Sequence, residues 1–168
     1  LGAIPDCVGP VLDSLRILDL EIQSMPKQAG IEFAHLNANK YRGVATFSTH
    51  DMAPMRLWWE ENPERTQRYY ATMLQKDGRA PLKMPAFIAE EVIARHLYCP
   101  SMMCIMALQD WLAVAAWLHN PDTRAERINV PGSAFCGWSY RMHIDIERLV
   151  GDVKFNEKLK LMITRSRR

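Results

Sequence analysis

The residues Ser48-Thr49-His50-Asp51 offer the clearest potential for chemistry in this sequence. They follow a β-prone apolar run that begins at Val44, so the polar groups come where a strand is expected to end. Enzymes with parallel strands place their functional groups at such carboxyl ends. An aspartate there can serve as a general acid or base, a metal ligand or an acceptor for sugar hydroxyls. The alternative is structural, with Asp51 or Thr49 only capping the next helix.

The composition indicates a chain that can bury a core. Hydrophobic residues make up 48% of the 168 residues and charged residues 24%, which excludes a disordered polypeptide. The net charge of +2 is too small to indicate binding to nucleic acid or to a membrane. Part of it comes from the final residues 165–168, which we expect to be a solvated, frayed end. We expect no signal peptide and no membrane-spanning segment.

The cysteines give no sign of a metal site or a redox motif. No Cys-x-x-Cys pair is present, and no histidine has zinc-finger spacing to Cys7, Cys99, Cys104 or Cys136. We expect reduced and mostly buried thiols in a cytoplasmic protein. No metal ion and no organic cofactor is expected.

Hydrophobic periodicity predicts an alternation of helices and strands. Strands are expected at 20–25 and 44–49, with a short extended piece at 128–130 and a long loop at 26–41. Asn62 and Pro63 predict a helix start, and Ser101 is expected to cap a buried helix. The expected helices cover residues 5–18, 55–61, 63–75, 85–97, 102–118, 144–150 and 156–164. Such alternation indicates βα units and a parallel sheet, but with too few strands to close a barrel.

Four blocks, in order, resemble the amylomaltase family of disproportionating 4-alpha-glucanotransferases. The Thr-His-Asp block at residues 48–51 continues into Arg56-Leu57-Trp58-Trp59-Glu60-Glu61. The other three blocks are Leu1-Gly2-Ala3-Ile4-Pro5-Asp6, Leu108-Gln109-Asp110-Trp111, and Arg127-Ile128-Asn129-Val130-Pro131-Gly132 with its trailing Trp138-Ser139-Tyr140-Arg141. The sequence differs from the commoner family pattern at residues 52–54. The resemblance spans nearly the whole chain.

The resemblance implies a fold and a reaction. Residues 1–168 would form the C-terminal portion of a single (β/α)8 barrel domain, helix-rich and incomplete as given. The family transfers α-1,4-glucan segments to the 4-hydroxyl of an acceptor glucose or glucan by a retaining double displacement. Such a mechanism needs a nucleophilic carboxylate and an acid/base carboxylate. Their motifs lie upstream of Leu-Gly in the family, so we expect this polypeptide alone to be inactive.

The resemblance also assigns roles to three residues. Asp51 would be the carboxylate that stabilises the transition state, and His50 and Asn129 would bind the substrate, which is maltose, a maltooligosaccharide or a longer α-glucan. On residue type alone, Asn129 could equally be a turn residue before Pro131-Gly132. A second possibility for the chain is a non-catalytic carbohydrate- or partner-binding module derived from a glycosidase barrel.

Two further expectations concern the residues around the site. Trp58 and Trp59 are adjacent on a helix and point apart, so at most one of them can face a cleft. Asp110 lies inside an apolar stretch, and a buried carboxylate needs a partner. We expect Arg127 to provide it.

Overall fold

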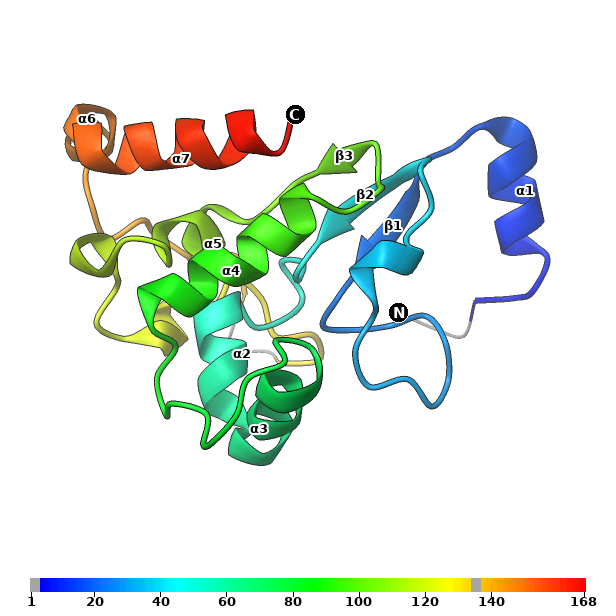
Figure 1. Cartoon of the computed structure of the whole chain (residues 1–168), viewed down its shortest axis with the longest axis horizontal. Helices are drawn as coiled ribbons and strands as arrows, with labels where there is room; N and C mark the ends of the chain where they lie inside the picture. Colours follow the sequence, from blue (N-terminus) through cyan, green and yellow to red (C-terminus); the bar gives the residue numbers. More distant parts are fainter. Residues whose placement is uncertain (1–3, 134–136) are drawn as a thin grey trace.

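A small parallel sheet carries the polar loop of interest. The computed structural model describes residues 4–133 and 137–168, so Leu1-Gly2-Ala3 of the first block and Cys136 lie outside the described residues. Strands β1 (Asp19–Ile22), β2 (Gly43–Thr46) and β3 (Met103–Cys104) pair side by side in the order β1-β2-β3 (Figure 1). Leu20 pairs with Val44, which in turn pairs with Met103, and both pairings are parallel. The predicted parallel α/β arrangement is therefore confirmed.

The connection from β2 to β3 is helical. It contains α2 (Met55–Glu61), α3 (Pro63–Thr72) and α4 (Ala86–Leu97). The α3 start follows the prediction, because the Asn62 side chain accepts a hydrogen bond from the Arg65 amide and Pro63 takes the first helical position. The long loop between β1 and β2 also forms as predicted, apart from the short 3-10 helix η1 (Leu36–Ala38).

The predicted core helix at residues 102–118 is wrong. In its place come β3, then α5 (Leu108–Leu112) and the 3-10 helix η2 (Ala116–Leu118). The Ile105 amide donates to the Ala45 carbonyl at 3.0 Å, so the start of this apolar run joins the sheet. A continuous apolar run fits a buried strand as well as a helix, and pairing with β2 decides between them. Ser101 caps no helix; its buried hydroxyl accepts from the Asn39 amide at 3.3 Å.

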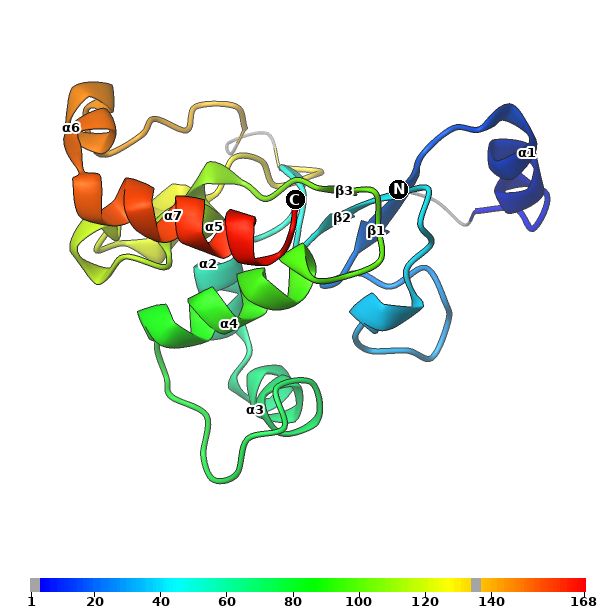
Figure 2. The same ribbon diagram turned by 45° about the horizontal axis from the view of Figure 1, so that its top comes forward.

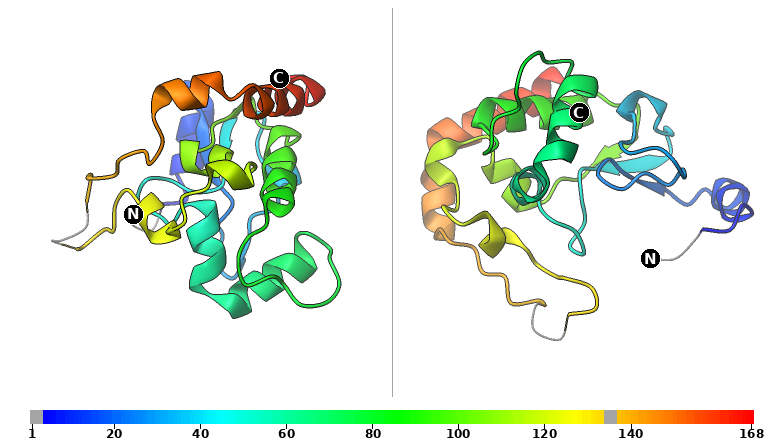
Figure 3. Two further views of the ribbon diagram at one scale, coloured as in Figure 1. Left: turned by 90° about the vertical axis from the view of Figure 1, so that its left-hand side faces the viewer. Right: turned by 90° about the horizontal axis from the view of Figure 1, so that it is seen from below.

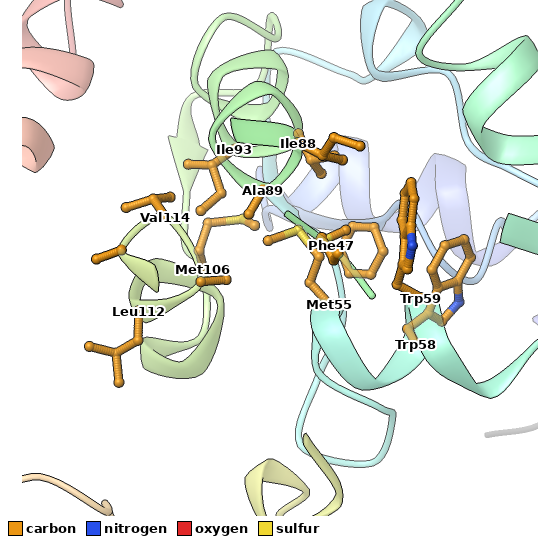
Figure 4. Packing of buried hydrophobic residues seen from close by; sticks show 14 of the residues in the cluster. Phe47, Met55, Trp58, Trp59, Ile88, Ala89, Ile93, Met106, Leu112 and Val114 are labelled. Carbon is orange, nitrogen blue, oxygen red and sulfur yellow. The ribbon is translucent and has the colours of Figure 1, made fainter. Parts of the chain in front are cut away.

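The main core lies between the helices and the end of the central strand. Figure 4 shows Ile88, Ala89 and Ile93 of α4 directed toward Phe47, which follows β2, and toward Met55 of α2. Trp58 and Trp59 are both buried in this cluster, at 4% and 1% exposure. Neither indole is therefore available to a ligand at the surface.

The two ends of the chain are packed very differently. Helix α1 (Val8–Leu15) stands apart from the other helices and has no buried residue (Figures 1 and 3). At the other end, α7 (Val153–Arg165) packs against α4, and α6 (Ile146–Gly151) packs against α7 (Figure 2). The basic tail is solvated as predicted, since Arg165, Arg167 and Arg168 are exposed. It is not frayed, because the Arg168 guanidinium donates to the carbonyls of Leu97, Cys99 and Met102.

The thiols follow the sequence-based expectation only in part. Cys99 is buried, Cys104 is partly buried and Cys7 is exposed, and all three are free. Burial raises the pKa of the Cys104 thiol to about 11, which keeps it protonated and unreactive at neutral pH. Among residues 4–133 and 137–168, no helix combines the length and the apolar character that crossing a membrane requires.

Candidate carbohydrate site

The polar loop begins at the carboxyl end of β2, the central strand. The amides of Gln23 and Ser24, which follow β1, donate to the carbonyls of Thr46 and Phe47 at 3.0 and 3.1 Å. The Thr46 hydroxyl donates to the Ser48 carbonyl at 2.9 Å, and this bond fixes the backbone as it leaves the strand. The next residues are progressively less covered, and His50 is exposed. The loop is thus anchored at its base and open at its tip.

His50, Asp51 and Asn129 meet at this loop, although Asn129 is far away in sequence. The Asn129 side-chain amide donates to Oδ1 of Asp51 at 2.6 Å. The His50 Nε2 atom lies 3.4 Å from Oδ2 of the same carboxylate. Each carboxylate oxygen keeps a further lone pair, and the carboxylate side chain is 29% exposed. The three residues singled out from the sequence therefore form one polar cluster that can accept and donate hydrogen bonds.

The segment carrying Asn129 is tied to the loop through its backbone. The Asn129 amide donates to the His50 carbonyl at 3.1 Å, and the Arg127 guanidinium donates to the Asn129 carbonyl at 3.2 Å. Asn129 also forms an antiparallel bridge with Gly137. A Cβ atom on Gly137 would lie 3.2 Å from the Asn129 side-chain oxygen, so glycine leaves room for this amide. The bridge explains why Asn129 faces Asp51.

The partner predicted for Asp110 is wrong. Asp110 is 1% exposed, but its Oδ1 atom accepts from the backbone amide of Met55 at 2.7 Å. Met55 is the first residue of α2, so its amide has no hydrogen-bond acceptor within that helix. Asp110, on α5, provides the acceptor. Arg127 instead pairs with Glu61 at the surface, with 2.9 Å between the charged atoms. Residue types indicated that Asp110 needs a partner but not that a backbone amide provides it.

A buried ion pair was not found from the sequence. The Arg56 guanidinium donates to the Glu126 carboxylate at 2.8 Å and to the Asn120 carbonyl at 3.0 Å, and both charged side chains are almost fully covered. The Gln109 side chain donates to the Glu126 carbonyl at 3.0 Å. These bonds connect α2 and α5 to the 3-10 helix η3 (Thr123–Glu126), which leads directly into Asn129. The loop at 48–51, which leads into α2, and the segment with Asn129, which follows η3, are therefore connected to the same polar network.

Burial raises the pKa values of two carboxyl groups in this region, those of Asp110 and Glu126, above their usual range. It raises the pKa of Asp110 to about 7, against the opposing effect of the Met55 amide. It likewise raises the pKa of Glu126 to about 7, although Arg56 acts in the other direction. One oxygen of each carboxylate, Oδ2 of Asp110 and Oε2 of Glu126, has no hydrogen-bond partner in the described structure. Desolvation without full compensation explains both shifts.

The raised pKa of Asp110 predicts a pH-dependent stability. The folded-state value lies above the unfolded value near 4, so the folded state binds more protons between about pH 4 and pH 7. This stabilisation is present below pH 4 and is lost as the pH rises through 7. Asp110→Asn keeps the acceptor for the Met55 amide but cannot ionise. When the pH is raised from 5 to 8, we expect the free energy of unfolding of the parent to fall by about 2 kcal/mol relative to that of Asp110→Asn, as measured by urea unfolding.

The control for this measurement is Asp77→Asn, at an exposed loop position. It should leave the pH dependence of the unfolding free energy unchanged. Equal pH slopes for the parent chain and Asp110→Asn would show that Asp110 is already ionised in the folded state.

The described residues offer no obvious place for a metal ion. Within 4–133 and 137–168, no group of three or more His, Cys, Asp or Glu side chains has the arrangement of a metal site.

An exposed polar cluster after the central strand of a parallel sheet is the arrangement of an α/β enzyme site. The chain matches the model of the 4-alpha-glucanotransferase family over residues 1–146 and belongs to that family. It is 33% identical over 168 residues to a 4-alpha-glucanotransferase of Oryza sativa subsp. japonica, a match that covers 100% of this chain and 18% of the rice protein.

Two more comparisons agree with the family assignment. A 4-alpha-glucanotransferase of Chlamydia muridarum is 29% identical over 162 residues, covering 95% of this chain and 30% of the relative. An amylomaltase from Streptococcus agalactiae, solved in complex with acarbose, superposes with a TM-score of 0.70 at 20% identity. That match covers 100% of this chain and 31% of the amylomaltase, and at this identity it shows the fold alone. The chain thus spans less than a third of the length of these relatives.

Proposed function

We propose that residues 1–168 are the C-terminal part of the catalytic (β/α)8 barrel of a 4-alpha-glucanotransferase. The complete enzyme transfers α-1,4-glucan segments to the 4-hydroxyl of an acceptor glucose or glucan, with retention at the anomeric carbon. Family membership and the 18–31% coverage of the relatives support this assignment. The short parallel sheet with helices packed around it is compatible with part of such a barrel.

The observation that carries the proposal is the Asp51 cluster at the carboxyl end of β2. In a retaining transfer, one carboxylate attacks the anomeric carbon and a second protonates the leaving oxygen, through a transition state with positive charge on the ring. Asp51 is proposed to be a third carboxylate, which accepts bonds from sugar hydroxyls and stabilises that charge. His50 and Asn129 border the same carboxylate and are proposed to bind hydroxyls of the neighbouring sugar.

The proposal includes the substrate and the cellular setting. The substrates are maltose, maltooligosaccharides or longer α-glucans of starch and glycogen metabolism, and the partner is the remaining part of the same barrel. No cofactor is needed, because carboxylates perform the transfer. A cytoplasmic location is supported by the free thiols of Cys7, Cys99 and Cys104.

Transfer assays on two polypeptides test this proposal. The 168-residue chain alone, incubated with maltotriose, should release no glucose and form no longer oligosaccharides. The polypeptide that also contains the nucleophile and the acid/base carboxylate should form both. Transfer by the chain alone would contradict the proposed division of the site. Sugar binding without transfer by the longer polypeptide would favour a non-catalytic binding module.

A further inference from the structure

Trp138 is the most exposed of the five tryptophans, with 69% of its surface accessible, and it lies beside the Asp51 cluster. Its ring centroid is 5.0 Å from that of His50, with 42° between the ring planes. Trp58 and Trp59 are buried, and the indole of Trp117 donates to Asp152. Trp138 is thus the tryptophan with an open ring next to the polar cluster. A large exposed aromatic surface beside convergent polar groups is typical of a binding site.

The backbone holds Trp138 in a conformation that a bulky residue rarely adopts. Its φ angle is +60°, in the left-handed region. The Trp138 amide donates to the Ile128 carbonyl at 2.9 Å, and the preceding residue forms the bridge to Asn129. The same short pairing therefore fixes both the indole and the amide that contacts Asp51. Unusual backbone conformations that are held in this way cluster at ligand sites.

We propose that Trp138 is a stacking platform for a pyranose ring of the bound α-glucan, beside Asp51. This inference rests on the proposed function and deepens it. A pyranose has an apolar face of C–H groups and an equatorial rim of hydroxyls. The indole covers the apolar face, while Asp51 and Asn129 bind hydroxyls at the rim. His50 supports the indole from its side, so the ring is positioned before the sugar arrives.

Maltotriose titrations of the chain, followed by NMR, test this platform. Trp138→Ala should weaken binding about tenfold, because the stacked ring surface is lost. Trp138→Tyr keeps an aromatic face and should stay within about threefold of the parent. Trp117→Ala is the matched control, since it removes an indole that is 41% exposed and bonded to Asp152. It should leave the affinity unchanged.

The outcomes separate the two proposals. Unchanged affinity in Trp138→Ala, with binding that Asp51→Ala abolishes, would overturn the platform and leave the proposed function standing. Equal losses in Trp138→Ala and Trp138→Tyr would also overturn it, because a stacking role tolerates tyrosine. An absence of Asp51-dependent maltotriose binding to the parent chain would overturn the platform, whereas the proposed function would still stand if the longer polypeptide transfers glucan in the assays above.

Discussion

In the longer polypeptide that also contains the proposed nucleophile and acid/base carboxylate, Asp51→Ala should lower the turnover of maltotriose by about two to four orders of magnitude. In the proposed role, the contact of Asp51 with the sugar strengthens as positive charge develops on the ring, so the loss of this contact should raise the energy of the transition state. The Michaelis constant should change much less than the turnover. Product formation by disproportionation, measured at saturating maltotriose, provides the rate.

Asp51→Asn refines this experiment. It keeps the size of the side chain and an oxygen that can accept from Asn129, but it removes the charge. If the turnover of Asp51→Asn is as low as that of Asp51→Ala, the effect comes from the lost charge. If it is close to that of the parent, the effect comes from the lost size and shape of the side chain. Asp77→Ala, in an exposed loop, is the control and should be neutral. A near-normal rate for Asp51→Ala would remove Asp51 from the mechanism.

The second large effect concerns the buried Arg56–Glu126 pair. Arg56→Met leaves the Glu126 carboxylate covered without a counter-charge, which should destabilise the fold by about 3–5 kcal/mol. At pH 8 this carboxylate is ionised in the parent chain, so the full effect should be visible there. Urea unfolding followed by tryptophan fluorescence measures it, since Trp58 and Trp59 are in the core next to this helix position.

Two further variants show whether the loss comes from the unpaired charge. The double variant Arg56→Met with Glu126→Leu should recover much of the stability, because no buried charge remains. Arg68→Met breaks the exposed Arg68–Glu32 pair and should change the unfolding free energy by less than about 1 kcal/mol. If Arg56→Met were as mild as Arg68→Met, the Arg56–Glu126 pair would not organise this part of the fold.

Local signals in the sequence were sufficient for most of the helices. Asn62 with Pro63 predicts the start of α3, and the apolar spacing around Ile88 and Val92 predicts α4, because these signals depend on neighbours within a few residues. The stretch at 102–118 was wrong for the opposite reason. Its apolar run fits either structure, and the deciding bonds go to Tyr41 and Ala45, far away in sequence.

In the candidate site, too, some features follow from the local sequence and others depend on contacts between residues far apart in the chain. The Ser-Thr-His-Asp pattern after a predicted strand indicated Asp51 as a candidate, because the position at a strand end is a local property, while the roles of Asp51, His50 and Asn129 came from the family resemblance. The bridge between Asn129 and Gly137, which aims the Asn129 amide at Asp51, depends on chain pairing that no spacing predicts. Likewise, Asp110 required a partner, but whether that partner is Arg127 or a helix amide depends on how α5 packs against α2.

The central claim is that the cluster of His50, Asp51 and Asn129 at the end of β2 binds an α-glucan. Mapping where maltotriose binds tests it most directly. The measurement is a two-dimensional amide NMR titration of the 19.3 kDa chain, compared with the Asp51→Ala variant. We predict saturable shifts centred on residues 49–52 and on Asn129, which disappear in the variant. Shifts that centre elsewhere, or that persist unchanged in Asp51→Ala, would contradict the claim.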